Sequence, residues 1–226
     1  MGTEKLTFQH KLLLPANLEQ VTLPDRRYYV TPEGKEYPSV TTLLGRIPAK
    51  RKIIENWQAR VGFAEAEAIK NAAARRGQLV HDALEKFLMN DPSYLAGINP
   101  IHKSTVRQMA ARLKKHITGD IFGIELGLYS DNLRTAGTVD LAAYMDHVIT
   151  VCDFKTSKRE KRPQDIKDYF LQATAYAIML REMYDIEAKK VCILMFVDGG
   201  GVFKYDASVA KLETQTRSVF EKLHAL

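Results

Sequence analysis

Two aspartates and a lysine lie near one another in the middle of this chain, and side chains of these types can act together on a metal ion. Asp140 ends the segment Gly137-Thr-Val-Asp140, and after an apolar run Asp153 and Lys155 flank Phe154. Side chains two residues apart on a strand share a face, so Asp153 and Lys155 point into one place while Phe154 faces the opposite way. The spacing therefore predicts a pocket that contains two acids and an amine.

A pair of carboxylates in one pocket requires a cation. At a separation of about 4 Å they repel each other by roughly 4 kcal/mol at an effective dielectric constant near 20. Oxygen ligands without a cysteine cluster favour Mg²⁺ or Mn²⁺ over a structural zinc, and the backbone carbonyl of Phe154 is a natural further ligand. Lys155 can then stabilise the charge of a pentacovalent phosphorane, or position or deprotonate the attacking water. These residue types together indicate metal-dependent phosphodiester hydrolysis.

The alternative is that Asp153 and Lys155 form an ordinary ion pair and that Asp140 is a turn acid. Against this, the run from Val148 to Cys152 is strongly apolar, and charges buried at the end of such a strand are costly unless they serve a purpose. The pattern therefore favours a functional site.

The elements that position these residues are a hairpin and a helix. Apolar and β-branched residues from 137 to 145 and from 148 to 154 predict two antiparallel strands, with Asp146-His147 as the turn. A helix is predicted from about Gln164 to Tyr184, and it is apolar almost all round, as in a helix packed against a sheet. Gln172 and Tyr176 are four residues apart and project from the same side. They are either site residues or a core amide and a phenol that reaches the surface.

In order and spacing, G-x-x-D, D-x-K and Q-x-x-x-Y resemble the motifs of the PD-(D/E)xK nuclease superfamily, specifically its RecB-like branch. The segment from Arg76 to Glu85 resembles the helix of that family which supplies a metal-binding histidine, here His81. Glu125 resembles an acid that many RecB-like members carry before G-x-x-D, although it is also compatible with an exposed strand position. The resemblance implies a restriction-endonuclease-like α/β core, a mixed central sheet flanked by helices. It also implies Mg²⁺ or Mn²⁺ bound by His81, Asp140, Asp153 and the carbonyl of Phe154.

A second resemblance covers the N-terminal half. Tyr37-Pro-Ser-Val-Thr-Thr42, then a basic stretch and Trp57, is similar to the mitochondrial genome maintenance exonuclease and its phage relatives. That branch is implied to cut single-stranded DNA, threading an end through a helical arch. Physically, the hydroxyls of Ser39, Thr41 and Thr42 either cap the following helix or grip a phosphate.

With 226 residues, 46% hydrophobic and 27% charged, the chain is expected to form one globular nuclease domain over residues 1–226. Residues 1–117 are predicted to be mainly helical, with a strand over 26–30 and helices over 41–88 and 101–117. Residues 118–226 are predicted to form the catalytic sheet core. Its strands are expected near 121–130, 134–145, 148–154, 189–197 and 202–205, with a last helix from Ser208.

The net charge of +6 is concentrated in three stretches, residues 46–76, 103–115 and 156–162. Each alone is compatible with a solvated face, but three around one site suggest a polyanionic partner, DNA. The predicted DNA-binding basic residues are Lys50, Arg60, Arg76, Lys158 and Arg159. Four aromatic residues near the first stretch can stack unpaired bases: Tyr28, Tyr29, Trp57 and Phe63. The alternative for Trp57 and Phe63 is a place in the core, which is favoured more for Phe63 than for Trp57.

No apolar stretch approaches 18 residues and no signal-peptide core begins the chain, so a cytoplasmic protein of a bacterium or phage, without membrane association, is expected. Cys152 and Cys192 lie in apolar runs and are predicted to be buried thiols. Some RecB-like proteins hold an iron-sulfur cluster with four cysteines, and two cannot do so. No cluster is therefore expected.

These observations converge on a metal-dependent DNA exonuclease that prefers single-stranded ends, in DNA replication, recombination or repair. Lys155 is expected to act on the water or the transition state, with Gln172 and Tyr176 orienting the lysine or the phosphate. Two alternatives remain open at this stage. One is a structure-specific or sequence-specific endonuclease, because the same core serves both, and the other is a non-catalytic nucleic-acid-binding module.

Overall fold

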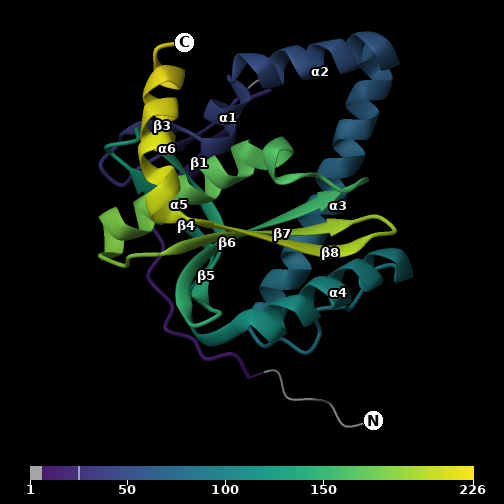
Figure 1. Ribbon diagram of the computed structural model, residues 1–226, viewed down its shortest axis with the longest axis vertical. Coiled ribbons are helices and arrows are strands. Elements are labelled where there is room, and N and C mark those ends of the chain that lie inside the picture. Colours follow the sequence, from purple (N-terminus) through teal and green to yellow (C-terminus); the bar gives the residue numbers. More distant parts are fainter. Residues whose placement is uncertain (1–6, 25) are drawn as a thin grey trace.

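A computed structural model describes residues 7–24 and 26–226, and its centre is one five-stranded sheet. The strand order follows the chain, and all neighbours are antiparallel except the pair β6 and β7, which is parallel. The strands are β4 (Ile117–Ser130), β5 (Thr135–Met145), β6 (Val148–Ser157), β7 (Lys190–Val197) and β8 (Gly201–Ser208). This mixed sheet with flanking helices confirms the predicted restriction-endonuclease-like α/β fold (Figure 1).

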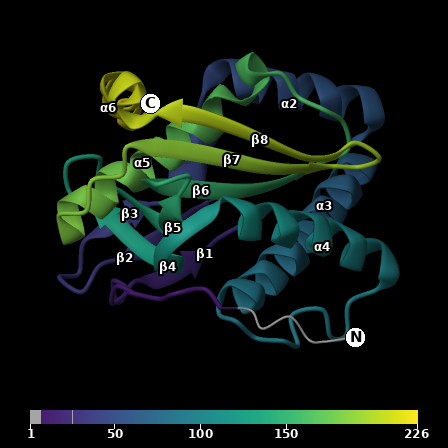
Figure 2. The same ribbon diagram turned by 60° about the horizontal axis from the view of Figure 1, so that its bottom comes forward.

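Helices cover both faces of the sheet, and each face has its own core. One core joins the sheet to α1 (Val40–Gly45), α5 (Lys167–Tyr184) and α6 (Val209–His224). The other joins it to α3 (Phe63–Leu88) and α4 (Pro100–His116). Figure 2 shows α3 and α4 on one side of the sheet and α5 on the other. Successive side chains of a strand point to opposite faces, so Val151 enters the first core while Cys152 and Phe154 enter the second. Both sides of β6 are therefore buried, which matches its nearly continuous apolar sequence.

The parallel pair requires a crossover, which a short 3-10 turn (Pro163–Ile166) and α5 provide. Helix α5 is buried at ten successive positions from Leu171 to Leu180, as its apolar sequence predicts. The predicted buried thiols are confirmed, because Cys152 and Cys192 are inaccessible and face each other across β6 and β7.

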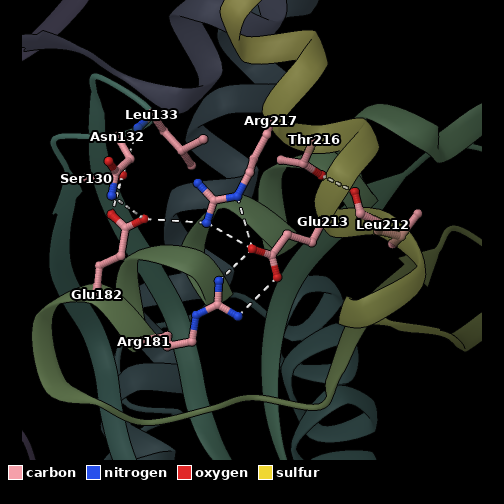
Figure 3. Close-up of polar contacts among 9 residues, drawn as sticks. All are labelled: Ser130, Asn132, Leu133, Arg181, Glu182, Leu212, Glu213, Thr216 and Arg217. Carbon is pink, nitrogen blue, oxygen red and sulfur yellow. Dashed lines mark hydrogen bonds and ion pairs between the residues drawn. The ribbon is translucent and has the colours of Figure 1, made fainter.

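A network of charges fixes α6 against α5 and the turn after β4 (Figure 3). Glu213 on α6 accepts hydrogen bonds from Arg181 on α5, at 2.5 Å, and from Arg217, at 2.9 Å. Glu182 accepts from the hydroxyl of Ser130, at 2.6 Å, and from the amide of Asn132. These contacts join α6, α5 and the turn after β4, so their role is to anchor the helices.

A second, smaller sheet precedes the helices. It contains β1 (Glu19–Thr22), β2 (Arg27–Val30) and β3 (Glu36–Pro38), in that order, and an isolated bridge between Ser39 and Ala136 connects it to β5. The sequence predicted only the middle strand. The two outer strands are four and three residues long, too short for an alternating pattern to be recognised.

Helix α2 (Pro48–Val61) stands away from the sheet, and α3 descends from its far end (Figure 1). None of its fourteen described residues is buried. The corner between the helices is Gly62, whose φ of +89° is in the region that favours glycine. The described residues contain no helix that combines the length and apolar character needed to cross a bilayer.

Candidate active site

The β5–β6 hairpin brings the predicted acids together as the sequence indicated. Its turn residues Asp146 and His147 both have positive φ, the conformation of a tight two-residue hairpin turn. Asp140 and Asp153 are 8% and 1% exposed. One oxygen of Asp140 accepts the backbone N–H of Phe154 at 2.5 Å, which holds the strands together beyond their last register pair, Leu141 with Cys152.

Lys155 lies beside Asp153, as the two-residue spacing predicts. Its Nζ atom is 2.6 Å from Oδ2 of Asp153, and the side chain is 21% exposed. The two side chains form an ion pair. No hydrogen bond to either carboxylate oxygen of Asp153 is found in the described part of the chain, although both oxygens are buried. A buried carboxylate in this state is stable only if something else binds it.

His81 extends from α3 to the same place. Its Nδ1 atom is 3.4 Å from a carboxylate oxygen of Glu125 and 3.4 Å from one of Asp140. The ligand atoms of these three residues all lie within 4.8 Å of one another. On its other side, the Nε2 atom of His81 is 3.2 Å from the carbonyl oxygen of Phe154. The structure thus gathers His81, Glu125, Asp140 and the predicted carbonyl ligand.

Glu125 has an unusual backbone conformation. It lies on β4 between the register pairs Ile124 with Leu141 and Leu126 with Val139, opposite Asp140. Its φ is +44°, which a non-glycine residue in a strand rarely adopts and which costs free energy. The side chain is half-buried and directed at His81. The sequence resemblance suggested this acid, and a strained backbone that places a carboxylate at the site supports it.

Burial and the neighbouring charges shift the pKa values of the clustered side chains in different directions. Burial raises the pKa of Asp153 to about 6, although Lys155 opposes the change. Burial also raises the pKa of Glu125. For His81, burial acts to lower the pKa, but hydrogen bonds to Asp140 and Glu125 outweigh it and raise the pKa to about 10. Without a cation, the site therefore holds a proton on His81 where a metal ion would compete.

The donor set fits a hard divalent cation. It offers one imidazole nitrogen, a backbone carbonyl and several carboxylate oxygens, a combination that suits Mg²⁺ or Mn²⁺. The buried oxygens of Asp153 support this fit, because they form an ion pair with Lys155 but no hydrogen bond with the described residues, and so keep capacity to bind a cation.

Gln172 and Tyr176 lie on the face of α5 that meets the sheet, and both are buried. Burial raises the pKa of the Tyr176 phenol. A Cβ atom at Gly137 would lie 2.8 Å from the phenol oxygen, so the glycine of the G-x-x-D motif makes room for this tyrosine. Their predicted action on the lysine or the phosphate stays a prediction.

Tyr169 is a neighbour of the site that sequence reasoning missed. Its ring centroid is 5.2 Å from the Nζ atom of Lys155 and 5.1 Å from that of Lys161, within the range of cation–π attraction. Lys161 also donates a hydrogen bond to its hydroxyl at 3.0 Å. Tyr169 precedes Gln172 by three residues, so the helical spacing that selected Gln172 and Tyr176 could also have selected it.

The predicted phosphate-binding hydroxyls have local partners. Ser39 is the N-cap of α1 and accepts the backbone N–H of Thr42 at 3.0 Å, which is the capping role that the sequence left open. The hydroxyl of Thr42 donates to the carbonyl of Arg27, and that of Thr41 accepts from the Arg27 guanidinium. Their contact with DNA stays a prediction.

The predicted DNA-binding cations divide into two groups. Lys50 is 2.6 Å from Asp168, and Arg76 is 2.7 Å from Asp198, so each is already paired with an acid. The side chains of the other three are exposed to solvent and belong to Arg60, Lys158 and Arg159.

Two expectations for aromatic residues are wrong. Phe63 was favoured as a core residue, but it is 71% exposed, because the α2–α3 corner stands away from the sheet and offers nothing to pack against. Tyr29 was considered for base stacking, but it is 4% exposed and its hydroxyl donates to Gln20. Tyr28 and Trp57 are half-buried.

Fold and site together define a mixed α/β domain with an acid-and-lysine centre at the end of two adjacent strands. The sequence profile of the PD-(D/E)XK nuclease superfamily matches residues 56–225, and the chain belongs to this superfamily. It is therefore a nuclease, and nucleases of this superfamily typically use divalent metals. A comparison with curated proteins finds no match. The profile begins within α2, so the N-terminal resemblance and the RecB-like branch remain predictions.

Proposed function

We propose that this nuclease is a Mg²⁺- or Mn²⁺-dependent DNA exonuclease of the RecB-like branch, with a preference for single-stranded ends. The observation that carries the metal dependence is the buried carboxylate of Asp153, which has no hydrogen-bond partner in the described residues although Lys155 lies beside it. His81, Glu125 and Asp140 present further ligand atoms next to it.

In the proposed mechanism, His81, Asp140, Asp153 and the carbonyl of Phe154 would hold the metal ion, with Glu125 as an additional acid. The bound ion supplies Lewis-acid chemistry by neutralising charge on the phosphate and acidifying water. Lys155 keeps its positive charge because the two aspartates raise its pKa against the effect of burial. Its ammonium group therefore stabilises the negative charge of the transition state or positions the attacking water.

The preference for free single-stranded ends rests on the resemblance of the N-terminal half and on the basic stretches near the site. Arg60, Lys158 and Arg159 expose positive charge that phosphates can contact. A structure-specific or sequence-specific endonuclease would use the same centre. The pathway, replication, recombination or repair, follows from the resemblance alone.

The test is a nuclease assay on end-labelled single-stranded, duplex, flapped and circular DNA, with Mg²⁺, with Mn²⁺ and with EDTA. We expect linear single strands to be shortened from an end, circular single strands to resist, and EDTA to stop cleavage. Cleavage of circles would replace the exonuclease with an endonuclease. Binding without any cleavage would favour the non-catalytic module, and wild-type cleavage by Lys155→Ala would remove the assignment of the site.

A further inference from the structure

A groove at the end of the strand that carries Lys155 has no role in the mechanism proposed above. It has a volume of about 670 Å³ and is lined by α3, by the start of α4 and by the last residues of β6. We propose that it binds the base of an unpaired nucleotide next to the scissile phosphate. This proposal rests on the proposed function and adds to it a subsite with its own contacts.

The wall on α3 is apolar without being part of the core. Ala68, Ile69, Ala72 and Ala73 all line the groove, and the two pairs at four-residue spacing, Ala68 with Ala72 and Ile69 with Ala73, place small apolar groups along one side of the helix. The exposed middle of a helix ordinarily carries charged side chains, so a smooth wall of methyl groups here leaves room for a flat, largely apolar partner. A nucleobase has such a face.

The opposite wall continues directly from the catalytic strand. Thr156 and Ser157 follow Lys155 on β6, and both line the groove. Thr156 faces the α3 side of the sheet with Phe154, and Ser157 faces the same side as Lys155, so a base held there would lie at the end of the strand that carries the lysine. This continuity favours a nucleotide of the substrate over an unrelated small molecule.

The rim of the groove is mainly basic. Lys158 and Arg76 line it, with Glu65 as the one acid among the lining residues. Arg76 holds Asp198 through one terminal nitrogen, while its buried Nε atom finds no partner among the described residues. The positive charges of Lys158 and Arg76 beside the groove suit the phosphate of a nucleotide whose base contacts the α3 wall.

The geometry also explains a preference for unpaired bases. A base enclosed by walls from three elements has left its stack and cannot keep its partner in a second strand. The methyl groups of the α3 wall offer no hydrogen bonds that distinguish one base from another. The subsite should therefore be tolerant of sequence and selective for single strands.

The test compares the same substitution at two adjacent exposed positions of α3. Ala73 lines the groove, whereas Ala74 is exposed and does not line it. Leucine is a good helix former, so Ala73→Leu and Ala74→Leu should fold equally well, which thermal unfolding verifies. Binding of an oligothymidylate is measured in EDTA, so that the result does not depend on cleavage. We expect Ala73→Leu to raise the Kd about fivefold and Ala74→Leu to change it less than about twofold.

A second measurement locates the base. Oligonucleotides that carry one abasic position, moved stepwise from the end, are bound to the wild type and to Ala73→Leu. At the position that occupies the groove, the abasic site should weaken binding to the wild type and have little further effect on Ala73→Leu. Equal effects of the two leucine variants, or additive effects of the abasic site at every position, would overturn the subsite. The cleavage assay on circular and linear DNA tests the exonuclease separately.

Discussion

The two ends of the β5–β6 hairpin carry the same residue types in opposite states. At the turn, Asp146 accepts hydrogen bonds from His116, at 2.7 Å, and from Lys190, at 2.9 Å, and it is paired with Lys204 at 2.9 Å. This carboxylate is 37% exposed. Burial acts against its ionisation, but the hydrogen bonds from these three neighbours lower the pKa of Asp146.

At the other end, Asp153 is 1% exposed and has no hydrogen-bond partner in the described residues. Its pKa is raised to about 6, chiefly by burial. The two ends have similar residue types, but they differ in whether the hydrogen-bonding capacity of the carboxylate is satisfied within the protein. A structural cluster completes its own hydrogen bonds, whereas a cluster built for a ligand leaves bonding capacity open. Counting acids and bases in the sequence would have treated both alike.

The largest contrast is expected from removing one charge at each end. Asp153→Asn should lower the cleavage rate at least about a hundredfold, because a metal ligand is lost. Asp146→Asn should leave it within about twofold, since the turn does not face the site. The check is the initial rate on a linear single strand with Mg²⁺. A similar loss in both variants would erase the distinction between the ends.

A bound metal ion should stabilise the fold through the Asp153 end of the hairpin and not through the Asp146 end. At a concentration a hundred times its Kd, a bound ion adds about 2.7 kcal/mol to the free energy of unfolding. We expect Mn²⁺ to raise the melting temperature of the wild type and of Asp146→Asn, and to leave Asp153→Asn nearly unchanged. The increase should grow as pH rises from 6 to 9, because the ion competes with the proton that His81 holds with a pKa of about 10.

At the Asp153 end, the lysine beside the carboxylate also lies over an aromatic ring. Tyr169→Leu removes the ring next to Lys155 and should lower kcat about three- to tenfold with little change in KM. Tyr169→Phe keeps the ring and should restore most of the rate. The matched control is Tyr205→Phe, which loses only a hydrogen bond to the carbonyl of Lys161. An increase in KM without a change in kcat would assign Tyr169 to DNA binding.

The smallest effect concerns stability and pH. Because Asp146 is partly exposed, its ion pairs should contribute about 1 kcal/mol near pH 7. A lowered pKa means that this stabilisation is present above the unfolded-state pKa and is lost as pH falls below about 4.

The contribution of Asp153 to stability changes with pH in the opposite direction. Its raised pKa makes the metal-free protein less stable as pH rises from about 4 to 6, and Asp153→Asn should remove that slope. Urea unfolding from pH 3 to pH 8 measures both.

Local patterns predicted most of the site. The hairpin, the face shared by Asp153 and Lys155, and the four-residue spacing of Gln172 and Tyr176 all follow from strand and helix periodicity. His81 was found because the family motif fixes its helix. The predicted five strands and the four longer helical stretches are present, with β4 beginning four residues earlier, at Ile117, and β8 continuing to Ser208.

What sequence reasoning missed depends on contacts between distant segments. Phe63 is exposed because the α2–α3 corner stands away from the sheet. The hydrophobic periodicity of a helix does not show where that helix lies relative to the rest of the protein. Tyr29 is buried by packing of the small sheet, whose outer strands carry little pattern. The positive φ of Glu125 arises from the β4–β5 pairing rather than from a glycine. Each is decided by tertiary context, which overrides local preference.

Helix α2 is stabilised largely independently of the sheet. A helix without a buried residue adds almost nothing to the cooperative core, so the free energy that folds the sheet and the free energy that keeps α2 helical are separate quantities. Amide hydrogens of α2 should exchange with solvent long before those of β5 and β6. Helix α2 can therefore rearrange without loosening the carboxylates of the proposed active site.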